Sequence, residues 1–196
     1  MVINNVLNFK TTLKVFSGFL DGTLATSNPE PNDRLVGLIR SNIETNQKLW
    51  DLEDLARMTE LGPEHVANAK REIDKNNDIR NNLIREIDVE IGNQIQVASL
   101  NSQEKFYAES PGMIIDRLAI LFIKSSAIRG LLLVIKETDL IEEYRGKESI
   151  ILRQISLLGD FFDSYLDKLK NKEVFFEIQQ PVKIYNDERV KKYIKL

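Results

Sequence analysis

The stretch from Val66 to Ile95 limits what this chain can fold into, because it contains a row of mostly aliphatic residues at intervals of three or four positions. This spacing is typical of a long helix that packs along one face against other helices. Three polar residues interrupt the otherwise aliphatic row: Lys70, Asn77 and Arg80. A second polar row lies beside it at seven-residue intervals: Asp74, Asn81 and Asp88.

These polar rows have two interpretations. Burying a polar group without a partner costs roughly 1–3 kcal/mol, so such side chains must pair, stay hydrated or hold a ligand. A polar layer that fixes the register of the helices is one interpretation. The other is a polar pocket between helices, where bundle folds place their ligand sites.

A helix over about residues 34–60 is predicted to precede this one. Its inward face carries one polar residue among apolar ones: Leu35, Leu38, Asn42, Leu49 and Ala56. Four further residues share a row along or beside that face: Asn46, Trp50, Glu53 and Arg57. Gly62 and Pro63 then predict a stop and a restart, because glycine suits the end of a helix and proline suits the first turn.

The rest of the chain also has helical periodicity. Helices are predicted over residues 2–20, 111–136 and about 138–170, with turn-rich connections at 21–33 and 99–110. Ser110 followed by Pro111 is a favourable helix start. The helix from residue 111 is apolar nearly all round, which is typical of a central element. Its charged residues are therefore expected to pair, with Glu53, Asp54 and Asp74 as candidate partners for Arg117 and Lys124.

The fold class predicted from these patterns is all-α: an antiparallel up-and-down helix bundle of four to five long helices with a short β-like C-terminal tail. One domain is expected over residues 1–196, divided into an N-terminal helix and linker (1–30), a bundle core (31–170) and a tail (171–196). Residues 174–178 are strand-like, 182–185 are a candidate second strand and 187–196 a short basic helix. The tail is expected to lie over the bundle, pair as a hairpin or reach a neighbouring subunit.

Charge and composition exclude several classes of protein. The chain has 27 basic and 30 acidic residues in 196, so it lacks the basic excess of a general nucleic-acid binder. It has no cysteine and one histidine, too few ligands for a transition-metal site. Mg²⁺ remains a candidate cofactor if Glu53, Asp54, Asp74 and Asp88 converge, although ordinary salt bridges would give the same pattern.

No segment of the sequence is typical of membrane insertion or secretion. The N-terminal residues lack the basic and continuous apolar regions of a signal peptide. The most apolar zone, Met113–Ile135, contains several charged residues and lacks the run of about 20 apolar residues that spans a bilayer. We therefore expect a cytoplasmic protein without a membrane span.

Four motifs resemble those of a bacterial family known as a domain of unknown function. They are L-W-x-L-E-D-x-A-R (49–57), K-R-x-I-D-x-x-N-x-x-R-N (70–81), I-x-x-I-D (84–88) and P-G-x-I-I-D-R-L-A-I-L (111–121). Together they cover about a third of the chain in matching order. The resemblance implies an all-helical fold and a gene context of cell-surface polysaccharides, but it implies no reaction.

Two hypotheses about function follow. The first is an interhelical pocket for a small anionic or polyhydroxy ligand, with or without catalysis. Its candidate catalytic residues are Glu53, Asp54 and Asp74. Its candidate ligand-binding residues are Asn46, Trp50, Arg57, Lys70, Asn77, Arg80, Asn81, Asp116, Arg117 and Lys124. The second hypothesis is a non-enzymatic interaction or assembly protein, whose polar residues only fix helix register and which forms a homodimer through its tail or a helix face.

Overall fold

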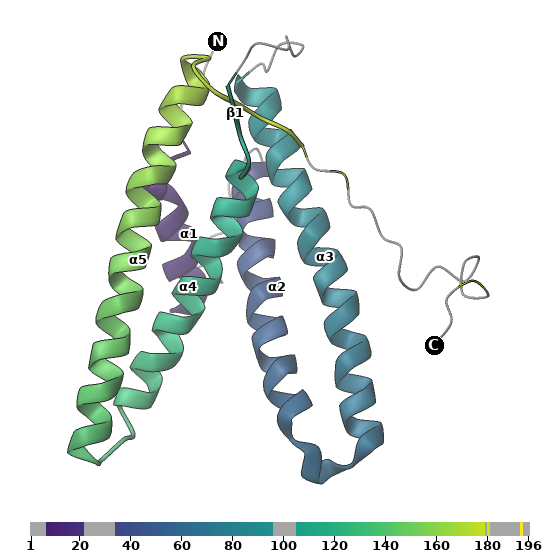
Figure 1. Ribbon diagram of the computed structural model, residues 1–196, viewed down its shortest axis with the longest axis vertical. Helices are drawn as coiled ribbons and strands as arrows, with labels where there is room; N and C mark the ends of the chain where they lie inside the picture. Colours follow the sequence, from purple (N-terminus) through teal and green to yellow (C-terminus); the bar gives the residue numbers. More distant parts are fainter. Residues whose placement is uncertain (1–6, 22–33, 96–104, 179, 181–192, 194–196) are drawn as a thin grey trace.

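Two long antiparallel helical hairpins dominate the structure, a computed structural model that describes residues 7–21, 34–95, 105–178, 180 and 193. The first hairpin joins α2 (Arg34–Arg57) to α3 (Pro63–Ile95), and the second joins α4 (Pro111–Leu132) to α5 (Thr138–Lys170). Both hairpin turns lie at the same end of the molecule, and the hairpins spread apart towards them (Figure 1). This arrangement confirms the predicted all-α bundle.

The turn between α2 and α3 follows the pattern expected from its sequence. A single 3-10 turn, η2 (Thr59–Leu61), leads to Gly62, which adopts a positive φ of 93°. Glycine adopts such a φ without steric cost, and Pro63 then begins α3. The predicted helix ends agree with the structure within about three residues at this hairpin.

The core is built around α4, which contacts α1 (Phe9–Leu20), α2, α3 and α5. Ile114, Ile115 and Leu118 on α4 have an exposed fraction of zero. The predicted central position of this helix is therefore confirmed. Ser110 caps α4, because its hydroxyl accepts a hydrogen bond from the Met113 N–H at 3.3 Å.

The short N-terminal helix α1 is anchored to the second hairpin. The Phe9 N–H donates to Asp163 Oδ1 at 2.6 Å, and the Phe9 ring lies where a side chain at Gly159 would otherwise sit. Asn8 caps the helix by accepting from the Thr11 N–H at 2.8 Å. The helix predicted over residues 2–20 is thus found from Phe9 onwards, and residues 2–6 lie outside the described part.

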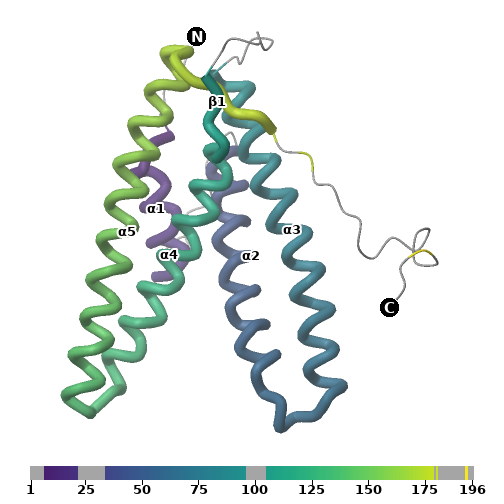
Figure 2. The backbone as a smooth tube through the Cα atoms, viewed as in Figure 1, coloured from purple at the N-terminus to yellow at the C-terminus, as the bar shows by residue number. Residues whose placement is uncertain are grey.

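The chain after α5 crosses the end of the bundle opposite the hairpin turns (Figure 2). There β2 (Phe175–Phe176) pairs in parallel with β1 (Phe106–Tyr107). The sequence predicted a strand at 174–178 with residues 182–185 as its candidate hairpin partner. It did not predict the pairing with residues 106–107, since a two-residue strand in a connection has no recognisable period. Of the three arrangements expected for the tail, its described part lies over its own bundle. The candidate strand at 182–185 lies outside the described residues, and so does the predicted helix at 187–196 except Tyr193.

None of the helices in the described ranges combines the length and apolarity needed to cross a membrane.

Candidate functional site

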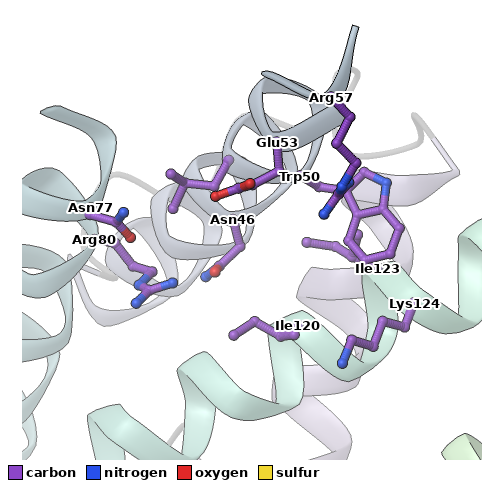
Figure 3. Close-up of a pocket in the computed structure, with 10 residues that line it drawn as sticks. Asn46, Trp50, Glu53, Arg57, Asn77, Arg80, Ile120, Ile123 and Lys124 are labelled. Atoms are coloured by element: carbon purple, nitrogen blue, oxygen red, sulfur yellow. The ribbon is translucent and has the colours of Figure 1, made fainter. Parts of the chain in front are cut away.

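A pocket of about 240 Å³ lies between α2, α3 and α4. Figure 3 shows side chains from all three helices directed towards the same space. The lining residues are Asn46, Leu49, Trp50, Glu53, Arg57, Asn77, Arg80, Ile120, Ile123 and Lys124. Because three separate helices contribute, the pocket exists only in the assembled bundle.

Positive charge predominates in the lining. Arg57, Arg80 and Lys124 contribute three cations, whereas Glu53 is the one carboxylate among the lining residues. Arg57 is already paired with exposed Asp54 across 2.6 Å. Lys124 is exposed at the rim and forms no ion pair with any residue in the described ranges. The pocket therefore has positive charge that its own lining does not neutralise.

A buried polar cluster lies beside the pocket and fixes its geometry. Asp116 Oδ1 accepts hydrogen bonds from Asn42 Nδ2 at 3.0 Å and from Asn46 Nδ2 at 2.8 Å. Asn42 is fully buried and Asn46 nearly so. A carboxylate that accepts two amide donors satisfies groups whose burial would otherwise be costly, so this cluster ties α4 to α2.

Arg80 connects this cluster to the pocket. Its Nε lies 3.9 Å from Asp116 Oδ1, within ion-pair range but too far for a hydrogen bond. This Nε is buried and has no hydrogen-bond partner in the described part of the chain. The side chain as a whole is 29% exposed, and it extends into the pocket opening beside Asn46 (Figure 3). A guanidinium in this position can present its remaining N–H groups to an anion while Asp116 holds it from behind.

The rest of the lining is largely apolar. Ile120 and Ile123 of α4 and Leu49 and Trp50 of α2 contribute to it. Trp50 is partly buried and packs against the main core while its indole borders the pocket. Such a surface can cover the non-polar face of a ligand whose charged groups meet the cations.

The structure separates the predicted site residues into three groups. Seven line the pocket: Asn46, Trp50, Glu53, Arg57, Asn77, Arg80 and Lys124. Asp116 lies directly behind them. The pocket lining does not include the other five: Asp54, Lys70, Asp74, Asn81 and Arg117. These five are exposed, because the rotation of each helix turns their side chains towards solvent.

Two of the predicted pairings are wrong. Arg117 pairs with Glu109 just before α4, and Lys124 has no acidic partner in the described residues, so neither pairs with Glu53, Asp54 or Asp74. The four carboxylates considered for Mg²⁺, those of Glu53, Asp54, Asp74 and Asp88, also do not converge. Within the described ranges no three His, Cys, Asp or Glu side chains come together as a metal site.

Asp88 has a separate role at the start of α4. It is 2% exposed and accepts a hydrogen bond from the Gly112 N–H at 2.7 Å. Burial raises the pKa of this carboxyl to about 6, although hydrogen bonds from Ser110 and Gly112 act in the opposite direction. A carboxylate at the N-terminus of a helix also interacts favourably with its dipole. Asp88 therefore joins α3 to α4 away from the pocket.

Sequence reasoning missed Asn42, Leu49, Ile120 and Ile123 as site residues. Asn42 carried a signal, because it is the polar member of the inward face of α2 and must therefore find a partner there. The three apolar residues carried none. An aliphatic residue on an inward face is indistinguishable from any other core residue until the neighbouring helices are placed.

Fold and site together define an all-α helical bundle with a cationic interhelical pocket. The chain belongs to the family described as protein of unknown function (DUF4254), whose model matches residues 36–178. The matched segment contains α3 to α5 and all of α2 except its first two residues, and hence every residue of the pocket. The chain matches no curated protein and no solved structure.

Proposed function

We propose that the pocket between α2, α3 and α4 binds a small anionic ligand that also carries hydroxyl groups. The observation that supports this proposal is the composition of the lining. It contains three cations, Arg57, Arg80 and Lys124, and one carboxylate, Glu53. Asp54 and Asp116 lie beside Arg57 and Arg80 outside the lining, so Lys124 is the cation of the pocket without an acidic partner in the described residues. A bound anion would supply that partner.

The lining suggests how such a ligand is oriented. Its phosphate or carboxylate would lie between Arg80 and Lys124, which reach the pocket from different helices. Asn77 offers its amide group and Asn46 its amide oxygen to hydroxyls, and Trp50 offers a flat apolar surface to a ring. A cavity of about 240 Å³ suits a compound of the size of one sugar phosphate.

Catalysis is a further part of the proposal. Of the three candidate catalytic carboxylates, Glu53 lines the pocket and would be the general base towards a ligand hydroxyl. Asp54 pairs with Arg57, and Asp74 is exposed on α3, so neither is assigned a role. A place in cell-surface polysaccharide metabolism rests on the family resemblance alone, and it makes sugar phosphates the first compounds to test.

Calorimetric and thermal-shift titrations with glucose 1-phosphate, inorganic phosphate and neutral glucose test the proposal. A ligand that binds only the folded protein stabilises it by about 2.7 kcal/mol at one hundred times its dissociation constant. Lys124→Met should weaken binding of the phosphate compounds by roughly 10- to 100-fold, the value of one charge-assisted hydrogen bond. Lys136→Met is the matched control, since Lys136 is also an exposed lysine but does not line the pocket.

A flat response to all three compounds would contradict this ligand class. A response that Lys124→Met and Lys136→Met reduce equally would show only general attraction to positive charge. Binding of glucose as tight as that of its phosphate would place the affinity in the hydroxyl groups and remove the role given to Arg80 and Lys124.

A purely structural role is the alternative, and the Asp116 cluster favours it. Asp116, Asn42 and Asn46 satisfy one another's hydrogen bonds, as expected of a layer that fixes helix register. The cluster and the pocket are separable by mutation. Lys124→Met leaves the cluster intact and Asp116→Ala removes it, so a loss of stability in Asp116→Ala together with no ligand response in the wild type would support the structural alternative.

A further inference from the structure

The outer surface of α5 carries apolar side chains that the rest of the described chain leaves uncovered. This helix packs against α4 and α1, and it forms one edge of the molecule (Figure 1). Its buried residues, such as Ile155 and Phe162, lie on the packed side. On the other side Ile150 and Leu157 are each 60% exposed and Phe161 is 43% exposed.

These three residues lie in one row, which we term the outer row. Their separations of seven and four residues place them on one face of the helix, over about 16 Å of its length. Spacing of this kind is the seam by which one helix packs against another. At one end Phe161 stacks on Tyr107 with ring centroids 6.2 Å apart, so the row continues into an aromatic cluster.

Two opposite charges border the outer row on one flank. Arg153 and Asp160 are seven residues apart, so they lie on the same side of the row one above the other. Both are exposed, and neither forms an ion pair with another residue of the described ranges. The surface thus presents an apolar row together with one unused positive and one unused negative charge.

This arrangement is self-complementary. A two-fold axis perpendicular to α5 makes two copies of the helix antiparallel. The charged flanks of both copies then lie on the same side of the interface. If the axis passes between residues 156 and 157, Arg153 of each copy lies opposite Asp160 of the other. Leu157 then contacts Leu157 of the other copy. Ile150 of each copy lies near Phe161 of the other, with an offset along the helix axis of two residues, or about 3 Å.

We propose that the outer row of α5 is a self-association surface, on which a second copy of the chain docks antiparallel about a two-fold axis. The occupant is a second copy because one register of the helix against itself pairs both charges and covers all three apolar side chains. A partner of different sequence would have no reason to match that spacing. The pocket between α2, α3 and α4 lies on other helices and stays open in such a dimer.

Sedimentation velocity of the full chain over a range of concentrations tests the surface. The wild type should change from monomer to dimer as the concentration rises. Leu157→Lys places two like charges at the axis and should leave the protein monomeric throughout that range. Leu133→Lys is the matched control, because Leu133 is 87% exposed at the α4–α5 turn and lies outside the outer row.

A charge swap tests the antiparallel register. Arg153→Asp alone or Asp160→Arg alone puts like charges opposite each other twice and should weaken the dimer roughly tenfold or more. The double variant Arg153→Asp/Asp160→Arg exchanges the charges within each copy and should restore dimerisation. These surface substitutions also keep the test valid if Leu157→Lys unfolds, which circular dichroism would report.

Three results would overturn the proposal. They are a wild type that is monomeric at every concentration, a dimer that tolerates Leu157→Lys as well as Leu133→Lys, and a double swap that remains as weak as either single variant. Capture of a different protein or of lipid vesicles by a chain that never dimerises would likewise assign the surface to another partner.

Discussion

The contact between α3 and α4 at Gly112 leads to a quantitative prediction about stability. A Cβ added at this glycine would lie 2.5 Å from the backbone oxygen of Ile84 and 2.9 Å from Asp88 Oδ1. The first of these atoms belongs to a helix backbone and cannot rotate away. Gly112→Ala therefore forces α3 and α4 apart.

The size of the effect follows from that geometry. Relief from 2.5 Å to an ordinary contact of 3.4 Å needs a shift of about 0.9 Å, which also lengthens the 2.7 Å hydrogen bond from the Gly112 N–H to Asp88. Overpacking typically costs about 1–3 kcal/mol and a hydrogen bond to a charged group contributes about 1.5–3 kcal/mol. Alanine regains about 0.5–1 kcal/mol as the better helix former. We expect the free energy of unfolding to fall by roughly 2–4 kcal/mol.

Urea denaturation followed by circular dichroism measures this difference. Gly146→Ala is the control, since Gly146 is also helical, has no positive φ and has nothing within 4 Å of the added Cβ. That variant should gain about 0.5–1 kcal/mol. If Gly112→Ala were as stable as Gly146→Ala, the close approach of α4 to Ile84 and Asp88 would be refuted, and with it the position of α4 against the pocket.

Two further predictions concern the buried carboxylates. The folded pKa of Asp88, about 6, lies above its ordinary value of 3.8. The stability linked to protonation of this group is therefore fully present below pH 3.8 and is lost as the pH rises through 6. The total loss is about 3 kcal/mol. The stability of Asp88→Asn relative to the wild type should therefore rise between pH 4 and pH 7 in urea denaturation, and a difference independent of pH would contradict the raised pKa. Asp116→Ala should lower the free energy of unfolding by about 2–5 kcal/mol at pH 7, because the buried Asn42 amide loses its acceptor and Asn46 loses one of its acceptors. The control is Arg117→Ala at the neighbouring position, which should cost less than about 1 kcal/mol, as expected for an exposed ion pair. Equal losses of stability in the two variants would show that the Asp116 cluster adds no stability.

The helices themselves follow from local sequence. A period of 3.5 to 3.6 residues, the Ser110-Pro111 start and the Gly62-Pro63 break are properties of short segments, and the structure keeps them. The apolar composition of α4 also makes it the central helix, because a helix that is apolar nearly all round must be covered on most sides. Fold class was therefore predictable without knowledge of any long-range contact.

Tertiary structure alone decided which polar residues meet. Asp74, Asn77, Arg80 and Asp88 all lie on α3, yet only Asn77 and Arg80 reach the pocket. Asp88 lies under the start of α4 and Asp74 faces solvent. Sequence spacing gives the angle between residues on one helix but not the rotation of that helix against its neighbours. That rotation is set by packing across the whole interface, so the sequence determined the helices and their polar rows, and only the assembled bundle determined the site.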